Sequence, residues 1–168
     1  MTIEDIKEYY SNRFEKIDNV VVVDKKETKE IRNVKYSLEI NRDSFRNLDK
    51  QAPLQEELIE RNFVIEKSLE VCENHLFYDL HSRRASFVNN YDLQDNHCIS
   101  YFHFYYRNET LYLNVYCGRM NFDTNFMFDN QTFVLAYKKV FNNFEFHNMK
   151  VEYGSIDVHI MSLHKITE

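Results

Sequence analysis

Glycine, proline and tryptophan are scarce: the 168 residues include two glycines, one proline and no tryptophan. Two glycines cannot form a glycine-rich phosphate loop of the Walker or dinucleotide-binding type, so side chains must hold any bound phosphate. No apolar run approaches the roughly 20 residues that a membrane-spanning helix needs. We therefore expect a soluble protein without a membrane partner.

Basic charge is also in short supply. Lysine and arginine number 21 against 27 acidic residues, which gives a formal net charge of -6. Sequence-independent binding to nucleic acid depends on a basic surface, so no nucleic-acid partner is expected, although a local basic pocket remains allowed. The three cysteines, Cys72, Cys98 and Cys117, are an odd number in a chain without an apolar leader, which favours a reducing, cytoplasmic location.

Hydrophobic periodicity predicts a single α+β domain over residues 1–168, with 43% apolar residues to form its core. Thr2 and Asp5 form a plausible N-terminal cap for the first helix. The polar segment 24–30 is predicted to be a turn. The predicted helices cover 2–17, 131–144 and a segment from Pro53 to Leu76. The predicted strands cover 19–24, 31–40, 85–88, 98–106, 111–117 and 156–163, and the first of them is expected to be short and buried.

The two strands around Arg107-Asn108-Glu109 are predicted to form a hairpin in the centre of the sheet. Both are aromatic on both faces, which indicates a sheet covered on both sides, one of them by a second copy of the chain. We therefore expect a homodimer that forms through the sheet face. In the last strand, strict alternation predicts Asp157, His159 and Met161 on one face.

Residues that suit the binding of an anionic nucleotide occur along the stretch from His81 to Arg119. Arg83, Arg84 and Arg119 carry guanidinium groups that bind phosphate bidentately, and Cys98 is a potential nucleophile toward an electrophilic ring carbon. Alternatives remain open, because paired arginines are often surface ion-pair residues, a strand-end arginine often forms a salt bridge, and a single cysteine is often a small core residue.

Six motifs in order resemble the thymidylate synthase family, which includes the deoxynucleotide hydroxymethylases. The similarity covers roughly residues 27 to 164, and each motif is weak by itself. The matching segments are the strand Glu27–Ile40, Ser82-Arg83-Arg84, Asn96-His97-Cys98 with His103-Phe104, Arg119, Asn130 and Asp157-Val158-His159-Ile160-Met161.

The resemblance implies a thymidylate synthase-like fold and a transferase that acts on C5 of a dUMP-like pyrimidine nucleoside monophosphate, with methylenetetrahydrofolate as one-carbon donor. Cys98 corresponds to the family's nucleophilic cysteine, and Glu57 is a faint counterpart of its catalytic glutamate. The arginines of the Arg83-Arg84 pair reach across the dimer to the neighbouring subunit's phosphate. The remaining substrate-binding positions are Arg119 for the phosphate, Asn130 for the base, Asp157 and His159 for the sugar, and His103 at the family's glutamine.

Departures from the family pattern support a second hypothesis. Met120 replaces the serine after the phosphate arginine, and Met161 replaces the sugar-binding tyrosine. A catalytically degenerate protein that binds a nucleotide or another partner without turnover is therefore the alternative. Asn130 could also be a helix N-cap, and His159 a core histidine. No ligand spacing for a metal ion is present.

Overall fold

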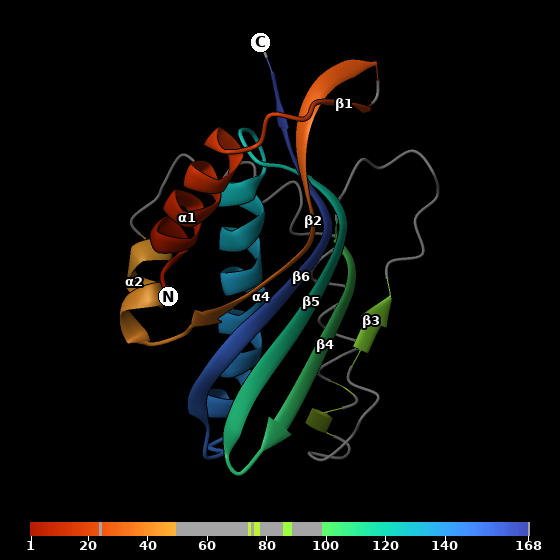
Figure 1. The fold of residues 1–168 in the computed structure, drawn as a ribbon. Helices are drawn as coiled ribbons and strands as arrows, with labels where there is room; N and C mark the ends of the chain where they lie inside the picture. The colour runs from red at the N-terminus through yellow and green to blue at the C-terminus, as the bar shows by residue number, and fades with distance from the viewer. Residues whose placement is uncertain (24, 50–73, 75, 78–85, 89–98, 168) are drawn as a thin grey trace.

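The protein is described by a computed structural model that covers residues 1–23, 25–49, 74, 76–77, 86–88 and 99–167. Within these residues, six strands form one mixed sheet in the order β1-β2-β6-β5-β4-β3. Figure 1 shows the helices α1, α2 and α4 together on one side of this sheet, which confirms the α+β class. The bounds are α1 Ile3–Glu15, α2 Arg42–Asp49, α4 Phe126–Phe146, β1 Val21–Val23, β2 Lys26–Glu39, β3 Ser86–Val88, β4 Ile99–Arg107, β5 Thr110–Asn121 and β6 Glu152–Ile166.

Helix α1 begins at the predicted cap. The Thr2 hydroxyl accepts a hydrogen bond from the Asp5 amide (3.1 Å), and the Asp5 carboxylate accepts one from the Thr2 amide (2.9 Å). This reciprocal pair satisfies two amides that the first turn leaves without helical partners. The helix then buries Ile6, Tyr10 and Phe14, which recur at helical spacing.

Helix α4 is the central element of the core. It packs against β5 and β6 and also contacts α1 and α2. Thirteen of its 21 residues are buried, as expected for a helix that lies between a sheet and two other helices. The predicted helix over 131–144 is therefore confirmed, but α4 begins five residues earlier, at Phe126.

The predicted hairpin of β4 and β5 is also confirmed. Its two turn residues, Asn108 and Glu109, both have positive φ (50° and 63°), as two-residue turns between twisted strands require. The hairpin lies inside the sheet, because β5 also pairs with β6 in parallel and β4 also pairs with β3. The predicted alternation of β6 holds as well, since Ile156, Val158 and Ile160 are buried, whereas Met161 is exposed.

Two local predictions near the N-terminus are wrong. The strand over 19–24 was expected to be buried, but β1 lies at the edge of the sheet, where β2 is its one partner among the described strands, and Val22 is 72% exposed. The segment 24–30 was expected to be a turn, but β2 already begins at Lys26. Pairing with the far end of β6, for example Thr28 with Ile166, extends β2 through this polar segment.

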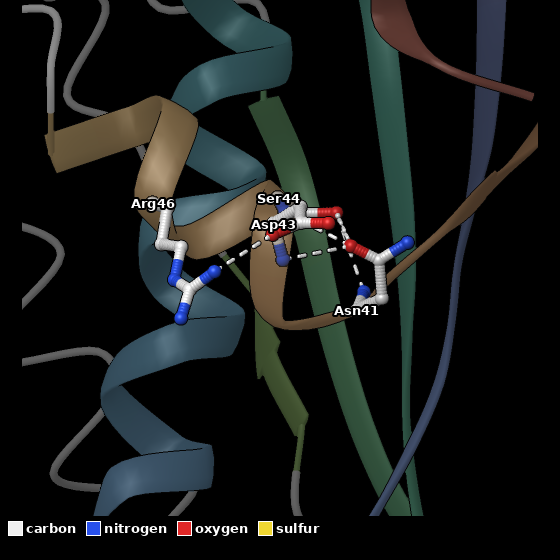
Figure 2. A network of polar contacts seen from close by, with 4 residues as sticks. All are labelled: Asn41, Asp43, Ser44 and Arg46. Carbon is white, nitrogen blue, oxygen red and sulfur yellow. Dashed lines mark hydrogen bonds and ion pairs between the residues drawn. The ribbon is translucent and has the colours of Figure 1, made fainter.

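Helix α2 was not predicted. Figure 2 shows its start, where Asn41 Oδ1 accepts hydrogen bonds from the amides of Asp43 (2.9 Å) and Ser44 (3.0 Å), while Arg46 pairs with Asp43 one turn further on. The side chain of Asn41 thus caps a short polar helix that lacks a clear apolar period. The helix predicted from Pro53 lies outside the described residues.

Candidate functional site

One face of the sheet is not covered by α1, α2 or α4, and we call it the helix-free face. The prediction that helices and a partner cover both faces is thus supported by the described helices on one face only. The residues on the helix-free face can be identified from the alternation along the central strands. In each strand they alternate with residues that are buried on the opposite face. These residues are Tyr101, His103 and Tyr105 of β4, Tyr112, Asn114 and Tyr116 of β5, and Asp157, His159 and Met161 of β6.

Aromatic contacts between neighbouring strands organise the helix-free face. Tyr116 stacks on His159 with ring centroids 4.7 Å apart, and Tyr105 stacks on Tyr112 at 4.9 Å. Such cross-strand aromatic pairs contribute about 0.5–1.5 kcal/mol each beyond their buried area. Tyr116 nevertheless remains 41% exposed and Met161 65% exposed. The face is therefore an ordered aromatic surface that is partly open to solvent.

Asp157 lies within electrostatic range of this tyrosine cluster. The pKa of Tyr105 is raised, first by burial and then by the negative charge of Asp157. Register places Asp157 beside Asn114 of β5, and Asn114 in turn beside His103 of β4. Two of the predicted substrate-binding residues, His103 and Asp157, thus share one row across three strands.

The alternation of buried residues breaks at one position in three neighbouring strands. Successive buried apolar residues are three positions apart instead of two between Ile31 and Val34 in β2, Cys117 and Met120 in β5, and Ile160 and Leu163 in β6, where Ser162 is also buried. Asn33, inside the β2 interval, has a positive φ of 52°. The break leaves two consecutive residues of each strand off the core face. Because of it, Arg119 lies on the helix-free face beyond Tyr116.

Four of the predicted substrate-binding residues are therefore brought to a common surface. His103, Asp157 and His159 project from β4 and β6, and Arg119 is exposed on β5, where it pairs in register with Ser162 of β6. His159 lies in the neighbouring row, between Tyr116 of β5 and Lys35 of β2. His159 is thus a surface-facing residue on the helix-free face.

Asn130 lies elsewhere, in the core between α4 and the sheet. It is fully buried, its Oδ1 accepts a hydrogen bond from the Tyr36 hydroxyl (2.8 Å), and its Nδ2 donates to the Phe126 carbonyl (2.7 Å). The structure therefore does not bring Asn130 to the surface that carries Arg119. The N-cap alternative is wrong too, because α4 begins at Phe126 and Asn130 falls in its second turn, facing the sheet.

The surroundings of Asn130 are those of a structural polar cluster. Burial raises the pKa of Tyr36 well above its usual range, so its hydroxyl stays protonated and donates to Asn130. Burial, together with the nearby Asp129 carboxylate, raises the pKa of the Cys117 thiol. A thiol with a raised pKa is not a ready nucleophile. Cys117 is therefore a core residue, and Cys98 remains the candidate nucleophile.

The remaining predicted residues, Glu57, Arg83, Arg84 and Cys98, lie outside the described residues. In sequence, Cys98 immediately precedes β4, whose first residue Ile99 pairs with Cys117. Among the described residues, no group of three or more histidine, cysteine, aspartate or glutamate side chains is arranged to hold a metal ion. No helix in the described ranges is long and apolar enough to cross a membrane.

Sequence reasoning missed three polar residues on the strands beside Arg119. Glu30, Arg32 and Ser162 form a connected group on β2 and β6, and Arg32 and Ser162 occupy the same row as Arg119. No local pattern could have found them, because the pairing of β2 with β6 joins residues about 130 positions apart. No family model and no curated protein matches this chain.

Proposed function

We propose that this chain binds a pyrimidine nucleoside monophosphate, with Arg119 as a ligand of the phosphate. The observation that carries the proposal is the common placement of Arg119, Asp157 and His159 on the helix-free face of two adjacent strands. Ser162, the register partner of Arg119, lies three residues beyond His159, about 10 Å along the strand. That separation allows one nucleotide to contact both the arginine and the residues proposed for its sugar.

The finer proposal is a transferase of the thymidylate synthase type. In this chemistry the Cys98 thiolate forms a bond to C6 of the pyrimidine, and C5 becomes carbanion-like and attacks a one-carbon electrophile. To complete the transfer, the C5 proton would be lost, the bond from the transferred carbon to the folate nitrogen would break, and that carbon would accept a hydride from the folate (methyl product) or a water molecule (hydroxymethyl product). Elimination of the thiolate would restore the C5–C6 double bond and free Cys98. Glu57 is the proposed catalytic glutamate, and methylenetetrahydrofolate is the one-carbon donor that the resemblance implies.

The second candidate is nucleotide binding without turnover. It is favoured by Asn130, whose two amide atoms are engaged with Tyr36 and Phe126 inside the core. Because Asn130 is fully buried between α4 and the sheet, its amide cannot reach the N3–H and O4 edge of a base that is bound on the helix-free face. A pocket that has lost its base-binding amide retains the phosphate ligand but not the orientation that C5 chemistry needs.

We expect Arg119→Ala to weaken the binding of dUMP at least tenfold. Hydrogen bonds to charged groups contribute about 1.5–3 kcal/mol each, and about 1.4 kcal/mol corresponds to one decade in affinity. Isothermal titration calorimetry on both proteins measures the change. Arg46→Ala is the matched control, because Arg46 is an exposed arginine on α2 that pairs with Asp43 at 3.3 Å. If the unmodified protein binds none of dUMP, UMP, dCMP and CMP at millimolar concentration, the nucleotide proposal is wrong.

A homodimer that forms through the helix-free face is part of the proposal. Exposed aromatic and apolar side chains on this face, such as Tyr116 and Met161, would be buried in an isologous contact. The nucleotide would then be enclosed between the two subunits, where the resemblance assigns Arg83 and Arg84 of the partner subunit to its phosphate.

The dimer is tested by introducing a charge into the proposed interface. We expect Met161→Glu to convert the dimer to a monomer at micromolar concentration, because burying an unpaired carboxylate in an apolar contact is strongly unfavourable. Phe146→Glu is the control, since Phe146 is an exposed apolar residue (79%) at the end of α4. Sedimentation equilibrium measures the mass of each variant. A monomeric unmodified protein would contradict the dimer and the contribution of Arg83 and Arg84 across it.

A further inference from the structure

Three polar residues form one register row across the central strands, just beyond the break in alternation. Arg32 of β2 pairs with Ser162 of β6, and Ser162 pairs with Arg119 of β5. Directly paired residues of neighbouring strands carry their side chains on the same face of a sheet. The row therefore places two guanidinium groups on either side of a hydroxyl group.

The contacts of Glu30 and the neighbouring buried residues confirm which face this is. Ile31, Met120 and Leu163 are the sequence neighbours of the three row residues, and all three are buried in the core. Glu30 lies two residues before Arg32 on the same strand, and its carboxylate contacts both Arg32 and Ser162. Arg32, Ser162 and Arg119 consequently share the helix-free face.

Glu30 holds the first two members of the row in place. Its Oε1 accepts a hydrogen bond from the Ser162 hydroxyl (2.5 Å), and its Oε2 accepts one from Arg32 Nε (2.9 Å). The Ser162 hydrogen bond, followed by that of Arg32, lowers the pKa of Glu30, so this carboxylate is ionised at neutral pH. Only Nε of Arg32 takes part in this contact. The terminal amino groups of Arg32 extend from a side chain that is 76% exposed.

We propose that Arg32 completes, together with Arg119, the subsite that binds the phosphate group, with Ser162 and Glu30 holding Arg32 in place. This inference rests on the proposed nucleotide binding and adds one ligand to it. Arg32 and Arg119 are two strands apart, which is about 10 Å between their backbones. Arginine side chains are long enough to converge on one phosphate over that distance, and the fork of each guanidinium matches two phosphate oxygens.

Each member has a distinct role in the subsite. Arg119 and Arg32 bind the phosphate from opposite sides, whereas Ser162, which is buried and donates its hydroxyl hydrogen to Glu30, holds that carboxylate in place. Glu30 is a positioning residue, because it directs Arg32 through Nε and leaves the terminal amino groups for the ligand. The row carries a net charge of +1 when Glu30 is included, which suits a phosphate monoester better than a neutral nucleoside.

The test is the affinity of an Arg32→Ala variant for dUMP and for deoxyuridine, measured by titration calorimetry on the full chain. We expect dUMP binding to fall at least tenfold and deoxyuridine binding to stay unchanged, since deoxyuridine lacks the phosphate. Arg46→Ala is the control, because Arg46, like Arg32, pairs with a carboxylate on its own element. Its partner Asp43 lies three residues before it in α2. An Arg32→Ala variant that binds dUMP as tightly as the unmodified protein would overturn the inference and leave the proposed function standing.

A second measurement separates this inference from the proposed function. If the unmodified protein binds no nucleotide, titration with inorganic phosphate decides the question for the subsite alone. If the unmodified protein binds phosphate and both Arg32→Ala and Ser162→Ala weaken this binding, the row is supported as an anion site. If the unmodified protein does not bind phosphate, the inference is overturned. Thermal unfolding midpoints of both variants within a few degrees of the unmodified protein exclude a folding defect as the cause.

Discussion

Replacement of Cys98 by serine is expected to abolish turnover and covalent adduct formation while leaving nucleotide binding nearly intact. The reacting species is a thiolate, and a serine hydroxyl is not ionised near neutral pH. A free cysteine has a pKa near 8.5, and Arg119 and the Arg83-Arg84 pair would lower the pKa of Cys98 if they meet at its thiol. Mass spectrometry of the protein incubated with 5-fluoro-dUMP and methylenetetrahydrofolate measures the adduct, and calorimetry with dUMP measures binding.

Cys117→Ala is the matched control for this experiment. Cys117 is 2% exposed, and burial raises the pKa of its thiol, so we expect the adduct to form on this variant as on the unmodified protein. Together with Arg119→Ala, the cysteine variants separate the two proposed functions. An enzyme loses its function with either Cys98→Ser or Arg119→Ala, whereas a binding protein loses it only with Arg119→Ala. Nucleotide binding without any adduct on the unmodified protein would contradict the transferase and support the second candidate.

Gly154→Ala is expected to destabilise the folded protein by about 3 kcal/mol, at the upper end of the range for overpacked sites. A β-carbon at this position would lie 2.2 Å from the Leu111 carbonyl oxygen and 2.9 Å from the Tyr112 ring. The backbone atom cannot move away without disturbing the pairing of β5 with β6 at this point. Urea unfolding followed by circular dichroism measures the change in the free energy of unfolding.

The surroundings of Gly154 explain why little relaxation is available. The Tyr137 hydroxyl accepts a hydrogen bond from the Gly154 amide (2.9 Å) and donates one to the Leu111 carbonyl (2.7 Å). Movement of either strand would therefore also strain contacts of a buried tyrosine on α4. Gly118→Ala is the matched control, since it alters the only other glycine and its added β-carbon would meet nothing closer than Ser100 Oγ at 3.8 Å. Equal stability of the Gly154 and Gly118 variants would contradict this account.

The local part of the fold was predictable because short-range interactions determine it. The capping box of Thr2 and Asp5 fixes the start of α1, and the two turn residues Asn108 and Glu109 fix the β4–β5 hairpin. Alternation in β6 correctly placed Asp157 and His159 on the face opposite Ile156 and Val158. In each case the information lies within about ten residues of sequence.

The sequence by itself thus determined the α+β class, the central hairpin and the common face of Asp157 and His159. Only the tertiary structure decided that Asn130 is enclosed in the core, because the position of its side chain depends on where α4 begins and on the Tyr36 hydroxyl 94 residues away. The same holds for the row of Arg32, Ser162 and Arg119. It exists only because β2, β6 and β5 pair in one register and break their alternation at the same position, and strand pairing between distant segments is not encoded in any local pattern.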